Sequence, residues 1–131
     1  MRQKLAHIAL LVDDYDRAIQ YYTEKLNFEL IEDSKLSDTK RWVLVAPPGS
    51  DGCQLLLAQA KDEHQRSFIG NQSGGRVFLF LHTDDFERDY QNLIRHEIRI
   101  VRQPVLEEWG KVAVFQDIYG NLWDLIEAKS F

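Results

Sequence analysis

The stretch that decides the fold is "DDYDRAIQYY", Asp13 to Tyr22, because it returns 71 residues later as "DDFERDYQNL", Asp84 to Leu93. Four of the ten aligned positions are identical at this offset. An internal repeat of this kind is typical of a fold built from two similar units. The sequence therefore predicts two related modules.

Each copy of the repeat follows a nearly continuous apolar run and carries the pattern of a helix. The runs "LAHIALLV" (5–12) and "VFLFLHT" (77–83) are typical of buried strands. The paired aspartates that open each copy suit the N-cap and the positive end of a helix. Apolar residues then recur at helical spacing, so each module is expected to open as a strand followed by a helix.

Three further strands are predicted after each helix, at 28–33, 41–46 and 54–59 in the first half and at 98–103, 111–116 and 122–127 in the second. The segments between them, including 104–110, read as short connections, which favours hairpins and excludes a doubly wound parallel sheet. The predicted fold class is therefore α+β. Two βαβββ modules form a cup-shaped mixed sheet with the helices on the outer face. We assign 1–60 to the first module, 61–75 to a linker and 76–131 to the second module of one structural domain.

Composition excludes several classes of protein. The chain has 131 residues, 44% of them hydrophobic and 28% charged, which is ordinary for one globular domain. A net charge of -5 without a basic cluster argues against nucleic acid. The single cysteine, Cys53, excludes an intrachain disulfide. The N-terminal apolar run is too short for a signal peptide or a membrane span, so we expect a cytoplasmic protein without a membrane partner.

The paired βαβββ pattern resembles the vicinal oxygen chelate superfamily. The similarity rests on the opening "HIALLVDDYDRAIQYYTEKLNFEL" (7–30) and the closing "VFQDIYGNLWDLIEA" (114–128). That superfamily includes glyoxalase I, fosfomycin-resistance thiol transferases, extradiol dioxygenases and bleomycin-resistance proteins, so the resemblance implies the fold better than any one activity. It also implies a homodimer, and two small sheets leave edges to cover.

In metal-dependent members, the resemblance implies up to four ligand positions on the first and last strands of the modules. His7, five residues before Val12, matches the first position, and Phe78 stands at its counterpart by the repeat offset. Asp124 takes the place of the ligating carboxylate in the closing motif, and Gln54 is the corresponding residue of the first module. Phenylalanine cannot ligate a metal and an amide is a weak ligand, so the resemblance implies an incomplete metal site.

Another interpretation joins His7, His82 and Glu127 as a two-histidine, one-carboxylate iron site. Strand geometry argues against it. At a rise of ~3.3 Å per residue, His82 lies roughly 13 Å along its strand from Phe78. Glu127 has the opposite parity to Asp124 and should point to the other face of the sheet. We expect His82 to be a contact at the rim of the pocket.

The candidate residues each have a structural alternative. His7 is either a surviving ligand or acid-base group, or a hydrogen-bonded histidine in a strand. Asp124 lies among apolar residues, so it either binds a ligand or ion, or pairs with a neighbouring cation. Trp123 is expected to pack against the helix side. The expected pocket residues are His7, Gln54, Phe78, Phe80, Asp124 and His82.

The leading hypothesis is a glyoxalase/bleomycin-resistance-like protein that binds or converts a small molecule in the cup between its modules. Its metal site is incomplete, so we expect no tightly bound cofactor and at most a weakly bound divalent metal. The alternative is a divalent-metal-dependent lyase, isomerase or dioxygenase in which His7, Gln54 and Asp124 hold an ion that acts as a Lewis acid. A purely interacting or structural domain is a third class. The sequence leaves open the ligand and the choice between enzyme and binding protein.

Overall fold

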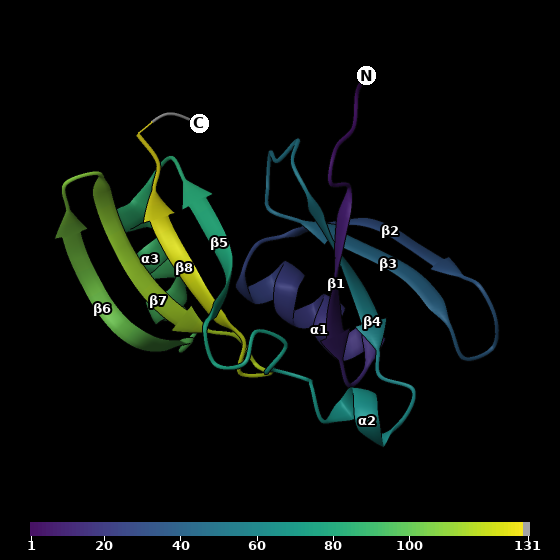
Figure 1. Ribbon diagram of the computed structural model, residues 1–131. Coiled ribbons are helices and arrows are strands. Elements are labelled where there is room, and N and C mark those ends of the chain that lie inside the picture. Colours follow the sequence, from purple (N-terminus) through teal and green to yellow (C-terminus); the bar gives the residue numbers. More distant parts are fainter. Residues whose placement is uncertain (130–131) are drawn as a thin grey trace. The chain divides into compact units, whose positions relative to one another are not determined.

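The computed structural model describes residues 1–129, and contacts divide the chain into two compact units, one of Met1–Ile69 and one that begins at Gly70. Each unit contains a strand, a helix and three more strands in that order (Figure 1). The boundary between the units falls inside the predicted linker, 61–75. Within the described part of the chain, no helix is long and apolar enough to cross a membrane.

Unit 1 has one four-stranded sheet with the strand order β1-β4-β3-β2. Strand β1 is parallel to β4, whereas β3 is antiparallel to both β4 and β2. A short helix, α2, follows in the linker. The elements are β1 (His7–Val12), α1 (Tyr15–Gln20), the π-helix η1 (Tyr21–Lys25), β2 (Glu29–Lys35), β3 (Arg41–Ala46), β4 (Gln54–Gln59) and α2 (Glu63–Arg66).

Unit 2 repeats this topology with the strand order β5-β8-β7-β6. Strand β5 is parallel to β8, and the other neighbours are antiparallel. The elements are β5 (Val77–Thr83), α3 (Phe86–Arg95), β6 (Arg99–Glu107), β7 (Gly110–Gln116) and β8 (Leu122–Glu127). The prediction of an α+β fold with two βαβββ modules is confirmed.

The repeated aspartates cap the two main helices. The carboxylate of Asp14 accepts the backbone N–H of Arg17 (2.9 Å), and that of Asp85 accepts the backbone N–H of Arg88 (3.0 Å). Each bond satisfies an amide that the first helical turn leaves without an intrahelical acceptor. The repeat thus marks the same structural event twice, the start of the helix that packs on each sheet.

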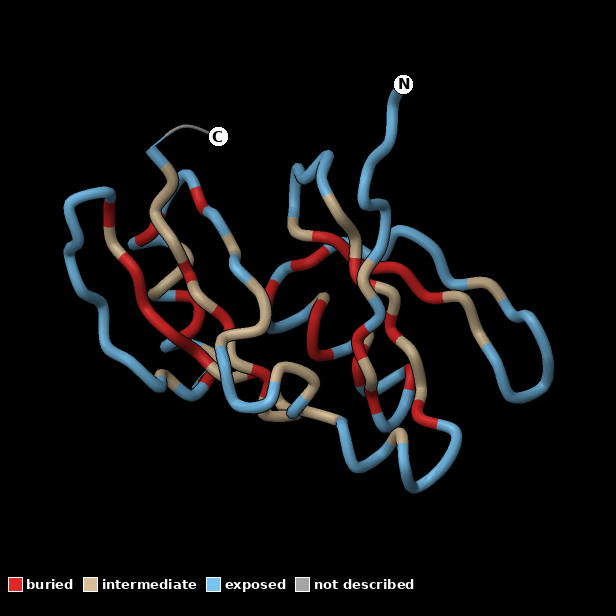
Figure 2. Tube along the Cα trace, viewed as in Figure 1, coloured by how far each residue is buried: buried red, intermediate tan, exposed pale blue. Residues whose placement is uncertain are grey.

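Each sheet buries one face against its own helix. Helix α1 contacts β3 and β4, and α3 contacts β6 and β8. Figure 1 shows α3 behind the strands of unit 2. In Figure 2 the central strand β7 is buried almost throughout, whereas the edge strand β6 is exposed along nearly its whole length. The residues with no more than 1% exposure include Leu10, Val12, Tyr22, Val43, Val45, Leu57, Phe115 and Leu125.

Two elements differ from the sequence prediction. Strand β6 continues to Glu107, so the interpretation of 104–110 as a connection is wrong for most of that segment. The pairing of β6 with β7 shifts register between Arg102 and Val105, around Pro104. Proline lacks the N–H that a strand ladder needs, but it is tolerated at a bulge on an edge strand, which explains how β6 continues past Pro104.

The first helix also differs from the prediction, because its C-terminal part is the π-helix η1. There the Thr23 hydroxyl donates to the carbonyl of Ile19 (2.7 Å).

Candidate functional site

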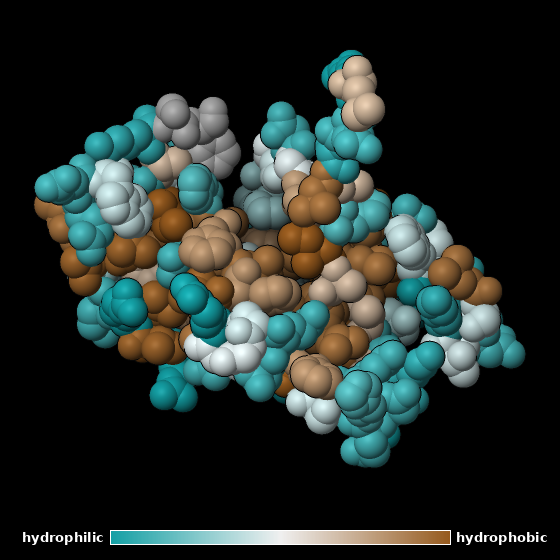
Figure 3. Space-filling model, viewed as in Figure 1, coloured by the Kyte–Doolittle hydropathy of each residue, from teal (hydrophilic) through white to brown (hydrophobic). Residues whose placement is uncertain are grey.

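Each sheet has a second face that its own helix does not cover, and we call it the open face. In unit 1 the buried Leu55 and Leu57 turn toward α1, so the alternation of strand residues places Gln54 on the open face, and the pairing of β1 with β4 places His7 beside it. In unit 2 the buried Trp123 and Leu125 turn toward α3, which leaves Asp124 on the open face. Hydrophobic surface lies over the strands of unit 2 in Figure 3.

On the open face of unit 1, the structure brings His7 and Gln54 together. They are direct partners in the parallel pairing of β1 with β4. The His7 ring also meets Trp42 of β3 edge to face, with ring centroids 5.9 Å apart and an interplanar angle of 78°. His7 is exposed, and among the described residues none hydrogen-bonds its ring. The imidazole is therefore held by an aromatic contact and keeps both ring nitrogens available.

On the open face of unit 2, Phe80 and His82 lie on one side of β5, as predicted. Phe80 is the partner of Asp124 and remains 62% exposed, and His82 is the partner of Ile126. Phe78 stands where the β5–β8 pairing shifts register, between Val77 and Leu79. Asp124 therefore has Phe80, and not Phe78, directly beside it.

Asp124 lies in a row of open-face residues that crosses all four strands of unit 2. Register places Arg102, Val114, Asp124 and Phe80 side by side on β6, β7, β8 and β5. Burial raises the pKa of the Asp124 carboxyl, and the Arg102 guanidinium partly opposes that rise. No cation of the described chain lies within ion-pair distance of Asp124, and no described donor hydrogen-bonds its carboxyl. Compared with an exposed aspartate, this carboxyl therefore keeps its proton to a higher pH.

Glu127 and Trp123 are placed as strand parity predicts. Glu127 is the partner of Thr83, whose buried side chain hydrogen-bonds Asp89 of α3. That register puts Glu127 on the helix side, opposite in parity to Asp124. Trp123 is only 2% exposed and stacks on Phe115 at 5.7 Å.

The turn "DIYGN" (117–121) positions β8 through one buried carboxylate. Asp117, 4% exposed, accepts the backbone N–H groups of Tyr119 (2.9 Å) and Asn121 (3.0 Å) and the indole N–H of Trp123 (3.2 Å). Gly120 has a φ of +101°, a conformation that favours glycine. The sequence interpretation used this motif only to locate Asp124. The role of Asp117 in anchoring this turn was not predicted. The sequence signal for it is an aspartate followed six residues later by a tryptophan that can donate a hydrogen bond.

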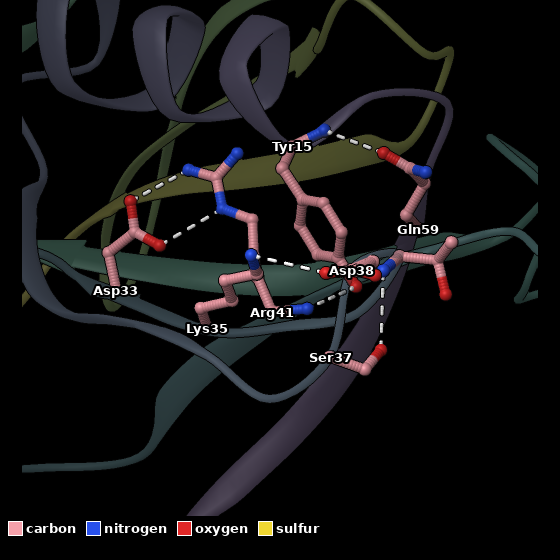
Figure 4. Close-up of a pocket in the computed structure, with 8 residues that line it drawn as sticks. Tyr15, Asp33, Lys35, Ser37, Asp38, Arg41 and Gln59 are labelled. Carbon is pink, nitrogen blue, oxygen red and sulfur yellow. Dashed lines mark hydrogen bonds and ion pairs between the residues drawn. The ribbon is translucent and has the colours of Figure 1, made fainter.

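Sequence reasoning also missed a polar pocket of about 590 Å³ in unit 1 (Figure 4). It lies between the start of α1 and the β2–β3 hairpin, and Tyr15, Arg41 and Gln59 are among the residues that line it. Its strand residues have the parity of the buried Val43 and Leu57, so the pocket lies on the helix side of the sheet and not on the open face. None of the predicted pocket residues lines it.

Metal-binding chemistry is sparse within each unit. Over residues 1–129, no three His, Cys, Asp or Glu side chains come together as a ligand set. Unit 1 offers one imidazole, His7, beside the neutral amide of Gln54, and unit 2 offers Asp124 beside a phenyl ring. A tightly held transition-metal ion needs stronger donors than this set supplies.

Comparison with known proteins adds the family context. The family model described as "Glyoxalase/Bleomycin resistance protein/Dioxygenase superfamily" matches residues 4–125. An uncharacterized protein of Shewanella frigidimarina is 57% identical over 128 residues, which cover 97% of this chain and 95% of that protein. YurT, an uncharacterized protein of Bacillus subtilis, is 29% identical over 128 residues, with coverage of 95% and 98%.

Two solved structures show the same fold over the whole chain. The crystal structure of UcmS2 superposes with a TM-score of 0.83 at 29% identity, covering 98% of this chain and 100% of that one. TnmS3, described as an antibiotic binding protein from Streptomyces sp. CB03234, superposes with a TM-score of 0.75 at 26% identity, with 98% of each chain covered.

Proposed function

The chain belongs to the glyoxalase/bleomycin resistance protein/dioxygenase superfamily, and from this premise we propose that it binds a small aromatic molecule against the open faces of its sheets without a tightly held metal ion. The observation that carries the proposal is Phe80, 62% exposed in the middle of a strand and directly beside Asp124. An exposed aromatic ring beside a partly buried carboxyl offers apolar and polar contacts together, as small-molecule sites do.

The open faces offer aromatic contacts in both units. Phe80 presents a phenyl ring in unit 2, and the His7–Trp42 pair presents two rings in unit 1. Aromatic rings stack with planar ligands and gain about 0.5–1.5 kcal/mol beyond the area they bury. The likeness to TnmS3, an antibiotic binding protein, supports the binding of a small molecule.

Asp124 supplies a polar contact in this apolar setting. The carboxylate can accept a hydrogen bond from a phenol hydroxyl of the ligand. Because burial raises the pKa of this carboxyl, the protonated form, which can donate to a carbonyl oxygen, also persists to a higher pH than in an exposed aspartate. Arg102, two strands away in the same row, is a second donor for the ligand. An oxygen-substituted aromatic molecule suits this combination.

The metal-dependent alternative has one specific observation in its favour, the direct pairing of His7 with Gln54. The predicted ligand set is weak, because Gln54 contributes a neutral oxygen and Phe80 flanks Asp124, the carboxylate of that set. We therefore rank metal-free binding first and the lyase, isomerase or dioxygenase second.

A cytoplasmic homodimer remains part of the proposal. Light scattering at micromolar concentration tests the dimer, since a monomeric mass contradicts it.

Binding can be measured by titrating the purified protein with bleomycin, an acridine and a hydroxynaphthoquinone, following ¹⁵N chemical shifts. The proposal expects an aromatic probe to shift amides on an open face, those of β5 and β8 in unit 2 or those around His7 and Trp42 in unit 1. Recovery of the unchanged probe afterwards separates binding from conversion. Shifts confined to the helix faces, or no shift with any of the aromatic probes, contradict the proposal.

A further inference from the structure

The polar pocket on the helix side of unit 1 is lined by side chains from four elements. It has a volume of about 590 Å³, within the usual range of small-molecule sites. Figure 4 shows the Tyr15 ring at its centre, with Arg41 on one side and Gln59 on the other. Apart from two aspartates, its lining residues are Tyr15, Lys35, Ser37, Thr39, Arg41 and Gln59.

The full charges of the pocket are already paired. Arg41 donates from Nε and Nη2 to the carboxylate of Asp33 (3.1 and 2.7 Å) and from Nη1 to Asp16 (2.9 Å). This guanidinium holds the pKa of Asp33 below its ordinary value. The Nζ of Lys35 lies 3.3 Å from a carboxylate oxygen of Asp38. Of the residues that line the pocket, Arg41 and Lys35 are positive and Asp33 and Asp38 are negative. Each of these charges has a partner, so none is left to attract an ion.

The neutral donors of the pocket, in contrast, are not used up. The Tyr15 hydroxyl accepts the backbone N–H of Arg41 (3.3 Å), which leaves its own proton to donate. Gln59 accepts the backbone N–H of Tyr15 at Oε1 (3.2 Å), which turns its NH₂ group to the other side. Within residues 1–129, no acceptor takes the Tyr15 proton or the Gln59 amide protons. Tyr15 is only 7% exposed, so an unused donor there is costly unless a ligand or solvent accepts from it.

Two hydroxyls of the hairpin add to this surplus. Ser37 Oγ accepts the backbone N–H groups of Thr39 (3.2 Å) and Lys40 (3.1 Å), so its own proton remains available. The Thr39 side chain has no hydrogen bond to the described chain. Both residues line the pocket.

The internal repeat shows that packing alone does not require these donors. Phe86 takes the place of Tyr15 in unit 2, and Lys111 Nζ lies 6.0 Å from its ring centroid, as Arg41 Cζ lies 5.2 Å from that of Tyr15. In unit 1, Lys35 of β2 is the strand partner of Arg41. In unit 2, the partner of the corresponding cation, Lys111, is Leu106 of β6. The aromatic ring and the cation near it thus occur in both units. The Tyr15 hydroxyl and the Lys35 amine, in contrast, are specific to unit 1.

We propose that this pocket is a second binding site, separate from the open faces, that takes a neutral, oxygen-rich small molecule such as a polyol or a monosaccharide. Unpaired hydroxyl and amide donors match the lone pairs of hydroxyl and carbonyl oxygens. Asp38, whose side chain is 98% exposed, can accept hydroxyl protons from the same ligand. A lining of equal positive and negative charge discriminates against ions of either sign.

The test titrates the full chain with glucose, myo-inositol and glycerol at millimolar concentrations and follows ¹⁵N shifts of the Gln59 side-chain amide and of the Ser37 and Thr39 backbone. The key variant is Tyr15→Phe, which places in unit 1 the residue that unit 2 already carries, so the fold is expected to persist. Tyr90→Phe is the matched control, because it removes a hydroxyl that donates to Gln103 in the other unit.

We expect at least one neutral probe to shift these signals and Tyr15→Phe to weaken its binding about threefold to tenfold, the effect of one lost hydrogen bond. Tyr90→Phe should leave the affinity unchanged. Three results overturn the proposal: no shift at these positions with any neutral probe, equal affinity of Tyr15→Phe and the wild type, or preferential binding of acetate over the neutral probes.

Discussion

Asp124 lies directly opposite Phe80 across the parallel pair of β5 and β8. The pair joins a carboxyl whose pKa is raised by burial to a ring that is 62% exposed. A carboxyl group and an aromatic surface thus stand side by side on the open face of unit 2. This combination is what separates the site from an ordinary sheet surface, where the exposed residues are polar.

Phe80→Ala should weaken the binding of an aromatic ligand about twofold to tenfold, because the ligand loses a stacking partner. The side chain is mostly exposed, so the free energy of unfolding should change by less than about 0.5 kcal/mol. Calorimetric titration and urea unfolding measure the two effects. Phe68→Ala, which truncates a phenylalanine that is 42% exposed in the linker, is the control and should leave binding intact. Equal loss in both variants would point to a general surface effect.

Asp124 should make stability depend on pH in a defined direction. Its folded-state pKa lies above the ordinary value, so folding favours the protonated carboxyl. The free energy of unfolding is then highest below the ordinary pKa and falls as pH rises from that value through the raised pKa. Asp124→Asn removes the titration. The variant should therefore gain stability over the wild type as pH rises through this window, as urea unfolding across a pH series can show.

Arg102 offers an independent check of the same carboxyl. Its positive charge lowers the Asp124 pKa, against the larger effect of burial. Arg102→Ala should therefore raise the Asp124 pKa further, which a carbon-detected NMR titration of the carboxyl reports directly. Arg95→Ala, in the last turn of α3, removes the same charge outside this row. A lowered Asp124 pKa in Arg102→Ala would contradict the assignment of the row.

The sequence predicted the fold well because its signals can be read without tertiary structure. The repeat is found by aligning the chain with itself, and the capping aspartates and strand parity are local patterns. Parity also placed Trp123 in the core and Phe80 with His82 on one face. The extension of β6 through Pro104 was missed, because a proline on an edge strand depends on the bulge that accommodates it. Strand parity carries no information on such a register shift.

The same limit affects the site. The repeat offset made Phe78 the residue of interest, but the register shift between Val77 and Leu79 brings Phe80 beside Asp124. The polar pocket was missed for another reason. Tyr15 and Gln59 belong to different elements and meet only through tertiary structure, so neither periodicity nor spacing could signal their contact.

Metal content gives a direct test of the incomplete donor set. Protein purified without added metal should carry well below one equivalent of nickel, iron, zinc or manganese by elemental analysis. His7→Ala and Asp124→Ala should leave that content unchanged, because neither residue completes a strong site. One equivalent of a tightly bound ion that disappears in both variants would favour the metal-dependent alternative.

Asp117→Ala should be among the most destabilising substitutions outside the aliphatic core. The carboxylate is 4% exposed and accepts hydrogen bonds from Tyr119, Asn121 and Trp123, so its removal breaks all of these bonds at once. A loss of about 2–4 kcal/mol in the free energy of unfolding is expected. Asp38→Ala, at a side chain that is 98% exposed, is the control and should change stability by less than about 0.5 kcal/mol. Because the turn sets the start of β8, Asp117→Ala should also disturb the amide shifts around Asp124, and unchanged shifts would separate the turn from the site.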